Sequence, residues 1–578
     1  MFTYTPPIDD YRFLLTHVLG FDEAMRDLGK DVDSDLAAAV LEEAGRMCAD
    51  RLLPLNREGD EQGSRLTPDG VVTPSGFTDA WRDFVAAGWA SLSAEEEHGG
   101  QGLPFVLQLW LDEMMSATNL SFGLFPGLTR GACEAIAAHA SEELKATWLR
   151  PLVSGEWTGA MALTESGAGT DLALLKTKAA ALGDGSYAVT GTKIFISSGD
   201  HDFGGNIVHL VLARLPDAPP GVKGISLFLV PKFLPDDQGG FTRRNGMSVG
   251  ALEKKMGIHA QPTCVMNYDE AVGWLVGEPH RGLAAMFTMM NAERLMVGIQ
   301  GLGIAGGAYQ QAAAYAKDRL QGRSADGARS PVTIIEHADV RRMLLNVRAF
   351  VEGGRALAGW VALQLDRSRH HPDAAERAKA DALVALLTPV VKAAFTDMGF
   401  ESAVQAQQVF GGHGYIREWG MEQYVRDARI AQIYEGTNGV QAMDLVGRKL
   451  GLGGGAVVDG FFATIAADLD GAGGLLIAER TRAALALLRT ATEALRGAGI
   501  DRAGAAAVDY LRLFALVSLG WMWTRMAVAA GHGDGPLQQA KRHIADFYAQ
   551  HVLSQAQSLA DAINAGEASV MALSADAF

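Results

Sequence analysis

The feature that most constrains the fold of this chain is the order in which two kinds of sequence follow one another. Residues 1 to about 155, and again residues from about 282 onward, carry apolar side chains at helical spacing. Between them lie short runs rich in β-branched residues, such as YAVTGTKIFISS and GISLFLVPKFL, broken by Gly, Asp and Pro. Short strands with turn signals between them are typical of an antiparallel sheet or barrel and not of βαβ units. The sequence therefore predicts a mainly α protein with a central antiparallel β domain.

A glycine-rich segment divides the second helical block. GRKLGLGGGAVVDG, residues 447–460, has the composition of a linker, and roughly four further helical stretches follow it. We expect an appended helical bundle there, which would pack on the rest of the chain or mediate oligomerisation. At the other end, Ser34 precedes a run of apolar residues at helical spacing and is the expected N-cap of that helix. The predicted domains are a helical domain (1–156), a β domain (157–282), a helical bundle (283–450) and a C-terminal helical bundle (451–578).

Composition and charge exclude several classes of protein. The chain has 578 residues and a formal net charge of −17, which argues against sequence-independent nucleic-acid binding because that needs a basic face. Three isolated cysteines without a CxxC pair suggest a reducing compartment and no thiolate metal site. The start lacks the basic and apolar regions of a signal peptide. The apolar run at 513–523 is too short to span a bilayer and is expected to be a buried helix. We expect a cytoplasmic protein without membrane insertion.

Several motifs have a plain structural explanation. GLGIAG, residues 301–306, matches the dinucleotide pattern G-x-G-x-x-G, but it lies inside a long helical segment with no preceding strand. Small residues that let helices pack closely explain it better. His413 lies in GGHGY, which is either a ligand-contacting loop or only a turn. The histidines have no metal-like spacing, and no G-x-S-x-G elbow is present. We therefore expect neither a metal centre nor a serine hydrolase.

Three other stretches could carry chemistry. In MALTESGAGTD, residues 161–171, an apolar run ends in hydroxyl and acidic side chains beside glycines. The backbone of such a turn can approach a ligand closely, or the segment is an ordinary strand-to-turn connection. Arg319 and Arg323 could hold a diphosphate, or they form a solvated helix end. In ARIAQIYEGTNGVQ, Glu435 stands between an apolar run and a glycine, which is unusual company for a solvated carboxylate.

Taken together and in this order, these segments resemble the acyl-CoA dehydrogenases, flavoenzymes that oxidise acyl-CoA thioesters. The resemblance covers about residues 35 to 450 and rests on five motifs in register. They are MALTESGAGTD, GTKIFISSG (191–199), NAERLMVG (291–298), QQVFGGHGY (407–415) and IYEGTN (433–438). The resemblance implies the fold of that family, in which a helical domain, a β-barrel and a four-helix bundle follow one another. It also implies FAD as the cofactor and an acyl-CoA as the substrate.

The resemblance assigns a role to individual residues. Glu435 corresponds to the catalytic base, which removes a proton from the α carbon of the thioester. An apolar setting suits this role because it raises the basicity of a carboxylate. The expected FAD contacts are Met161, Leu163, Thr164, Gly169, Thr170, Phe195, Ser197, Arg319, Gln408, Gly411, Gly412, Thr437 and Gly439. The expected substrate contacts are Thr170, Asn291, Arg294, Tyr434 and Gly436. Phe195, Ser197, Asn291 and Gly439 replace residues that are commoner in the family.

A longer subfamily is resembled by the added C-terminal helices together with the segments TYTPPIDDYRFLL, KGISLFLVPK, KKMGIHAQPTCVMNYDEAVGWLVGE and EGTNGVQAMDLVGRKL. This subfamily includes 3-(methylthio)propanoyl-CoA dehydrogenases as well as enzymes for ordinary fatty acyl-CoAs. This implies α,β-dehydrogenation of a short acyl-CoA to the trans-2-enoyl-CoA, with an electron-transfer flavoprotein as acceptor and a homodimer as the assembly. Two alternatives share the fold. An acyl-CoA oxidase would use oxygen as acceptor. An alkylation-response flavoprotein would bind DNA through its C-terminal domain, which would need a basic face that residues 451–578 do not clearly offer.

Overall fold

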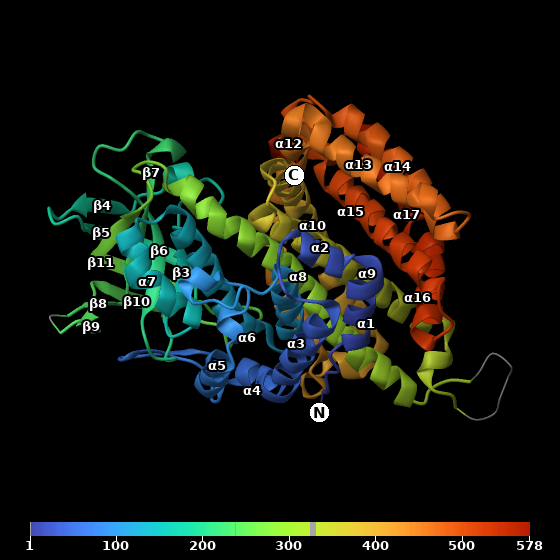
Figure 1. Ribbon diagram of the computed structural model, residues 1–578, viewed down its shortest axis with the longest axis horizontal. Helices are drawn as coiled ribbons and strands as arrows, with labels where there is room; N and C mark the ends of the chain where they lie inside the picture. The colour runs from blue at the N-terminus through green and yellow to red at the C-terminus, as the bar shows by residue number, and fades with distance from the viewer. Residues whose placement is uncertain (1, 237, 324–330) are drawn as a thin grey trace. The chain divides into compact units, whose positions relative to one another are not determined.

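The computed structural model describes residues 2–236, 238–323 and 331–578 and divides into two compact units (Figure 1). Unit 1 comprises Met1–Arg46, Pro104–Ala117 and Arg294–Phe578, whereas unit 2 comprises Met47–Leu103 and Thr118–Glu293. Segments distant in the chain pack into one unit, so the division follows packing and not chain order. The predicted domain boundaries therefore stay a prediction about sequence segments.

Unit 1 is helical. Two long helices, α6 (Phe105–His139) and α8 (Gly282–Asp318), contribute residues to both units. The remaining α-helices of unit 1 are α1 (Ile8–Phe13), α2 (Phe21–Asp27), α3 (Ser34–Met47), α9 (Ala338–His370), α10 (Ala374–Val409), α11 (Met421–Ala431), α12 (Asn438–Gly447), α13 (Ala456–Gly471), α14 (Leu476–Leu495), α15 (Ile500–Ala530), α16 (Pro536–Phe547) and α17 (Gln555–Ala565). The motif GLGIAG lies within α8, where a Cβ on Gly301 would come within 2.4 Å of the Phe395 carbonyl oxygen. The close-packing interpretation of this motif is confirmed.

Unit 2 contains the β domain. Its principal sheet is built from β3 (Thr158–Ala162), β4 (Lys178–Ala181), β5 (Tyr187–Ser197), β6 (Ile207–Arg214), β7 (Ile225–Pro231), β10 (Met247–Leu252) and β11 (Thr263–Val276). The strand order is β10-β11-β5-β4-β6-β3, and β7 pairs with both β11 and β6, so the strands β11-β5-β4-β6-β7 close into a ring. The predicted fold class, mainly α with a central β-barrel domain, is confirmed. One detail differs, because β6 pairs in parallel with β3 and with β4.

Strand β6 shows why the sequence of this sheet consists of continuous apolar runs. It is buried on both faces, since alternate side chains along a strand point in opposite directions. Val208, Leu210 and Leu212 belong to a core shared with Trp148 of α7 (Glu142–Ser154). Val211 belongs to the other core, with residues from the rest of the ring. Burial on two faces favours a continuous β-branched and aliphatic sequence over strict alternation.

The prediction that residues 1–155 are entirely helical is wrong, because a β-hairpin lies within them. The helices α4 (Leu53–Gln62) and α5 (Phe77–Ala86) flank a short hairpin formed by β1 (Arg65–Thr67) and β2 (Gly70–Val72). A second hairpin joins β8 (Phe233–Pro235) and β9 (Phe241–Arg244). The first hairpin is tied to the β domain because the Val71 N–H donates to Asp200 at 3.1 Å. A strand of three residues carries too little periodicity to be recognised within a helical stretch.

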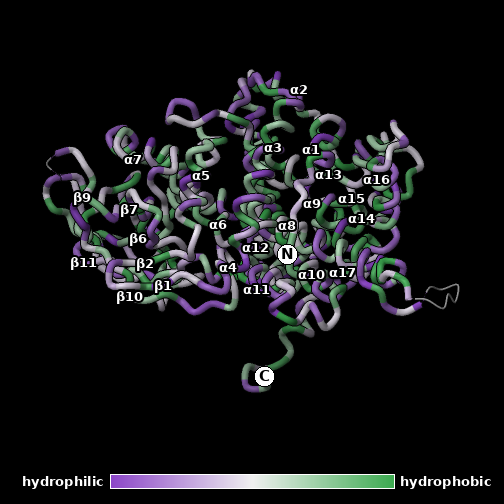
Figure 2. The backbone as a smooth tube through the Cα atoms, turned by 90° about the horizontal axis from the view of Figure 1, so that it is seen from below, coloured by the Kyte–Doolittle hydropathy of each residue, from purple (hydrophilic) through white to green (hydrophobic). Residues whose placement is uncertain are grey.

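The C-terminal helices α13 to α17 form the orange-to-red bundle of Figure 1, one helix more than expected. The difference arises because a π-helical turn, Tyr548–Val552, separates α16 from α17. The bundle packs on the preceding helices through α15. The Trp523 Nε1–H donates to the Ala349 carbonyl at 2.9 Å, and Gly353 of α9 leaves the space for this ring. After α17 the chain extends away from the helices (Figure 2), with Val570 and Met571 exposed.

Length and composition alone would allow three helical stretches in the described part of the chain to cross a membrane: 374–409, 438–471 and 500–530. Burial distinguishes α15 from a membrane span. Its most apolar window is 89% buried within the fold, so the apolar run at 513–523 is part of a core helix as expected. The glycine-rich segment before the bundle is a tight turn, in which Gly453, Gly454 and Gly455 all adopt left-handed backbone conformations.

Five buried charged residues join the C-terminal bundle to the N-terminal helices, and we call them the buried ion network. They are Asp10 of α1, Glu113 of α6, Glu352 and Arg355 of α9, and Lys541 of α16, none more than 8% exposed. Lys541 donates to Asp10 and, at 2.7 Å, to Glu352. Arg355 donates to Asp10 and, at 2.9 Å, to Glu113. The C-terminal bundle is therefore an integral part of unit 1.

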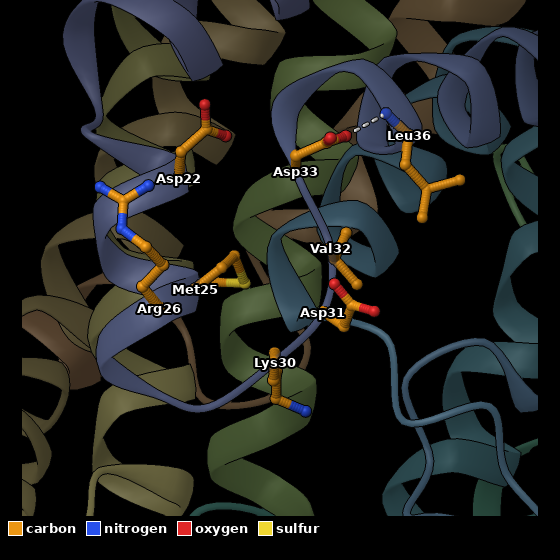
Figure 3. A pocket seen from close by; sticks show the side chains of 8 residues that line it. All are labelled: Asp22, Met25, Arg26, Lys30, Asp31, Val32, Asp33 and Leu36. Carbon is orange, nitrogen blue, oxygen red and sulfur yellow. Dashed lines mark hydrogen bonds between the residues drawn. The ribbon is translucent and has the colours of Figure 1, made fainter.

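A polar hollow of about 390 Å³ lies between α2 and α3 (Figure 3). The residues that line it are Asp22, Met25, Arg26, Lys30, Asp31, Val32, Asp33 and Leu36, and none of them is a predicted site residue. Figure 3 also shows the N-cap of α3, in which Asp33 accepts the Leu36 N–H at 2.8 Å. The prediction of Ser34 as the cap is wrong. Its backbone N–H and hydroxyl donate to Asp22 instead.

Candidate active site

Glu435 lies on a sharp turn between α11 and α12. The turn begins where the N–H groups of Ile433 and Tyr434 both bond the Ile430 carbonyl, at 2.9 and 3.1 Å. It ends where Thr437 caps α12 by accepting the Val440 N–H at 3.4 Å. Glu435 itself has a left-handed backbone with φ of 56°. Such a conformation is uncommon for a residue with a side chain and persists only where surrounding contacts hold it.

Glu435 is half-buried, but the Oε2 atom of its carboxylate is enclosed and is not neutralised by contact. Within the described residues, its Oε2 has no hydrogen-bond partner. Burial raises the pKa of Glu435 to about 7, although Arg294 and Lys392 act in the opposite direction. A carboxylate with a pKa near neutrality is a far stronger base than a solvated one and is still partly ionised at physiological pH. This is the environment that the apolar residues around Glu435 in the sequence predict.

Two buried cations hold the backbone of this turn. Arg294 of α8 donates to the Glu435 carbonyl at 3.4 Å, and Gln441 of α12 donates to the same oxygen at 3.0 Å. Lys392 of α10 is fully buried and donates to the Gly436 carbonyl at 2.8 Å. The cations thus bond peptide oxygens of the turn, and both remain close enough to Glu435 to act on its pKa.

The other predicted substrate contacts lie near this turn or on α8. Tyr434 donates its hydroxyl to Gln300 of α8. Asn291 is exposed on the same helix, whereas Arg294 is 9% exposed and bonded to the turn. The expected contacts of Asn291, Arg294, Tyr434 and Gly436 with the substrate stay predictions.

In unit 2, the predicted flavin loop is fastened to β5. The Ile194 N–H donates to the Thr164 carbonyl at 2.9 Å. Lys193, which is fully buried, donates to Glu165 at 2.9 Å and to the Leu163 carbonyl at 3.0 Å. Glu165 also accepts the Thr177 hydroxyl at 2.6 Å. The structure thus brings Leu163 and Thr164 together with the strand that carries Phe195 and Ser197.

The end of β5 offers an open apolar surface. The Phe195 side chain is 59% exposed on a left-handed backbone with φ of 61°. A Cβ added at Gly169 would meet nothing within 4 Å, and Thr170 beside it is exposed. A large aromatic ring left in water on a strained backbone suits a planar group that would cover it. Together with Met161 in β3, these residues fit the isoalloxazine part of the FAD that the family resemblance implies.

In unit 1, the ends of α8 and α10 bring together the residues predicted for the diphosphate and adenosine of FAD. Tyr315 of α8 stacks on Phe410 with ring centroids 4.1 Å apart, and its hydroxyl bonds His413 Nδ1 at 2.9 Å. Arg319 follows Tyr315 by one helical turn, and Gly411 follows Phe410. His413 also stacks on Trp419 at 4.2 Å, so its loop is an ordered aromatic turn.

Glycines and donors at this end fit an anionic group. A Cβ on Gly411 or Gly412 would meet nothing within 4 Å, so the backbone is open to a ligand. Gln408 lies in the last turn of α10, one turn before these glycines, and Arg323 is exposed beyond Arg319. Thr437 and Gly439 lie at the start of α12, where Thr437 acts as the cap. The FAD contacts of these residues stay predictions.

The residues that support Glu435 were not predicted from the sequence. Lys392, Asn438 and Asp397 form a hydrogen-bonded group behind the turn. A signal was present for one of them, because Lys392 is the single charged residue in the apolar stretch LLTPVVKAAF of a helix. Lysine is almost never fully buried unless it is paired. Nothing in the sequence indicated which carbonyl it would bond.

A barrel domain with a helical bundle that carries a buried, basic carboxylate is the framework of a flavin-dependent acyl-thioester dehydrogenase. Family models match nearly the whole chain. They are the acyl-CoA dehydrogenase N-terminal domain (34–156), middle domain (160–271) and C-terminal domain (280–450), and an acetyl-CoA dehydrogenase C-terminal-like domain (461–574). The chain belongs to the acyl-CoA dehydrogenase family, whose members are FAD-dependent oxidoreductases.

Known relatives extend over the full length. The chain is 45% identical to a 3-methylmercaptopropionyl-CoA dehydrogenase of Ruegeria pomeroyi, covering 95% of this chain and 96% of the relative. It is 33% identical to a broad-specificity linear acyl-CoA dehydrogenase, FadE5, of Mycobacterium tuberculosis, covering 100% of both. Among solved structures, ACDH-11 of Caenorhabditis elegans has a TM-score of 0.79 with 21% identity over 95% of this chain and 91% of that chain. This last likeness concerns the fold alone.

Proposed function

We propose that this dehydrogenase oxidises a short acyl-CoA thioester to the trans-2-enoyl-CoA, with Glu435 as the catalytic base. The first candidate substrate is 3-(methylthio)propanoyl-CoA, and the 45% identity to the Ruegeria pomeroyi enzyme over nearly the full length of both chains supports it. The observation that carries the role of Glu435 is its buried Oε2, which no described residue bonds, on a turn that two cations hold.

In this proposal, Glu435 accepts the proton that leaves the α carbon of the thioester. Burial raises the pKa of Glu435 to about 7, which makes this carboxylate a stronger base for removing the weakly acidic α proton. Arg294 and Gln441 fix the peptide of Glu435 through its carbonyl, so the carboxylate starts from one backbone position. When bound, FAD supplies the acceptor for the β hydrogen, which leaves as hydride. The electron-transfer flavoprotein and the homodimer stay predictions from the sequence resemblance. The cytoplasmic location stays a prediction from the cysteine content and from the composition of the first residues.

The base is tested by Glu435→Gln, which keeps the shape of the side chain and removes its basicity. Loss of a positioned general base typically costs about 10²-fold to 10⁴-fold in rate. We expect the variant to keep its FAD and to lose anaerobic bleaching of the flavin by acyl-CoA at every pH. Glu401→Gln is the matched control, since Glu401 lies half-exposed on α10 and pairs with Arg512 on the surface. A Glu435→Gln enzyme that bleaches at more than a tenth of the wild-type rate would overturn the assignment.

The substrate is tested by mixing the anaerobic protein with acyl-CoAs of graded length. We expect the fastest bleaching with methylthiopropanoyl-CoA, and substantial bleaching with butanoyl-CoA and pentanoyl-CoA. A thioether resembles a methylene in size, and a pocket discriminates one methylene by only about 1–3 kcal/mol. Fastest bleaching by palmitoyl-CoA would refute the short-chain proposal and would match the broad-specificity relative instead. Admitting air afterwards distinguishes a dehydrogenase, which re-oxidises slowly, from an oxidase, which re-oxidises rapidly and forms peroxide.

A further inference from the structure

Lys392 is a buried lysine for which the proposed chemistry has no use so far. It lies in the middle of α10 with no exposed surface, among apolar residues such as Val391 and Phe395. Placing an ammonium there is costly unless its donors are bonded. Two of its three donors are directed at the Glu435 turn, to the Gly436 carbonyl at 2.8 Å and the Asn438 Oδ1 at 2.9 Å. An ammonium retained at this cost and directed at this turn calls for an explanation.

The first consequence is mechanical. Asn438 is held in turn by α10, because its Nδ2 donates to Asp397 at 2.7 Å and to the Thr396 hydroxyl at 2.9 Å. Lys392 and Asn438 therefore form a tether between α10 and the segment 436–438, immediately after the left-handed Glu435. A strained residue keeps its conformation only where neighbours fix the chain on both sides. Without the Lys392 bonds, the Gly436 carbonyl loses its partner, and Asn438 alone connects this side of the turn to α10.

The second consequence is electrostatic. Lys392 and Arg294 are the two cations that act on Glu435, and each lowers the pKa that burial raises. The other charged groups that face this cluster are Asp397 of α10, which acts on Lys392, and Asp444 and Arg448 of α12, which act on Arg294. Burial lowers the pKa of Lys392 to about 8, so most of the ammonium is still charged at pH 7, where Glu435 is half ionised.

We propose that Lys392 is a positioning residue for the catalytic base, which fixes the Glu435 turn through Gly436 and Asn438 and favours the ionised carboxylate through its charge. The proposal rests on the proposed role of Glu435 and adds a residue to it. The Lys392 side chain would thus have two functions. Its hydrogen bonds hold the Glu435 turn against α10, and its positive charge favours the ionised form of Glu435. Variants that remove both, or that keep the charge, distinguish them.

The test measures the rate of anaerobic flavin bleaching by substrate as a function of pH. In Lys392→Met, we expect the acid limb of the profile to move upward by about one unit, the size of shift that a nearby opposite charge produces. The bleaching rate at pH 7 should then fall by about fivefold, because the ionised fraction of Glu435 falls from about one half to about one eleventh, and it should recover by pH 9. Lys392→Arg should restore the acid limb because it keeps the charge. Lys379→Met is the control, since Lys379 lies exposed on the same helix.

A second measurement does not depend on turnover. The unfolding of the wild type, Lys392→Met, Glu435→Gln and the double variant forms a double-mutant cycle. We expect coupling between the two sites at pH 7.5, where both are largely charged, and a markedly smaller coupling at pH 5, where Glu435 is protonated. Equal coupling at both pH values, or an unshifted acid limb in a folded Lys392→Met protein, would overturn the proposal. If Glu435→Gln remains active, the role of the base fails instead, whatever Lys392→Met does.

Discussion

Unit 1 holds two groups of buried carboxylates and cations that are alike in composition and opposite in arrangement. In the buried ion network, Lys541 and Arg355 direct their donors at carboxylate oxygens of Asp10, Glu113 and Glu352. Around Glu435, Arg294 and Lys392 direct donors at peptide oxygens instead, and the Glu435 Oε2 has no partner among the described residues. Both groups contain two cations, yet only the first neutralises its acids by contact.

The pKa values of Asp10 and Glu435 reflect this difference, whereas burial raises the pKa of Glu113 in spite of its bonds to Arg355. Burial would raise the pKa of Asp10, but Lys541 and Arg355 outweigh burial and bring it below its ordinary value. Burial prevails at Glu435 and raises its pKa to about 7. Two cations that bond its carboxylate bring the pKa of Asp10 below its ordinary value, whereas two nearby cations that are bonded elsewhere leave the pKa of Glu435 raised. A buried acid whose carboxylate oxygens are all bonded to cations contributes to structure and is not available as a base.

The largest effect on stability should come from breaking the buried ion network. Lys541→Met leaves Asp10 and Glu352 each with one fewer buried partner, and removal of one partner of a buried pair costs about 3–5 kcal/mol. Urea unfolding should show this loss, whereas Lys379→Met should stay within about 0.5 kcal/mol. The acid limb of the bleaching profile should not move in Lys541→Met. A loss below about 1 kcal/mol would show that the network does not anchor the C-terminal bundle.

Glu435→Gln should act on stability in the opposite direction, and only at higher pH. The pKa of Glu435 in the folded state, about 7, lies above its ordinary value of 4.5. Its contribution to stability is therefore fully present below about pH 4.5 and is lost as the pH rises through about 7. Glutamine avoids this loss. The variant should be more stable than the wild type by up to about 3 kcal/mol at pH 8 and by little at pH 5.

Chemical unfolding at the two pH values checks this prediction, with Glu401→Gln measured alongside. A Glu435→Gln variant that is less stable than the wild type at pH 8 would mean that the carboxylate is neutralised by contact after all. In that case the contrast with the buried ion network would disappear.

The smallest effect on stability should come from a surface ion pair, which serves as the reference for the two buried groups. Arg512 of α15 and Glu401 of α10 form a bidentate ion pair with distances of 2.9 and 2.8 Å, and Glu401 is 50% exposed. Water screens such a pair, so Glu401→Gln should cost only about 0–1 kcal/mol, and less at high salt. If it cost as much as Lys541→Met in parallel urea titrations, burial would not be the property that separates these groups.

Local sequence predicted those features that depend on neighbours along the chain. The β-branched runs between residues 157 and 280 predicted the sheet domain, because each strand presents side chains to two apolar cores. The small residues of GLGIAG predicted close helix packing. The apolar context of Glu435 predicted a carboxylate of raised basicity. The prediction of the helix cap failed at Ser34, because the neighbouring Asp33 is an equally suitable cap residue. The β1–β2 hairpin was not predicted, because a strand of three residues gives too short a pattern to recognise.

The sequence by itself thus determined the order of the helical and β regions, the family motifs and the identity of the candidate base. Only the tertiary structure decided which charges meet. Asp10 and Lys541 lie 531 residues apart in the chain and share a buried hydrogen bond. Lys392 reaches Gly436 across a separation of 44 residues, and Arg294 reaches Glu435 across 141. The pKa of a buried group depends on desolvation and on the charges within a few ångströms, and no local pattern in the chain encodes those distances.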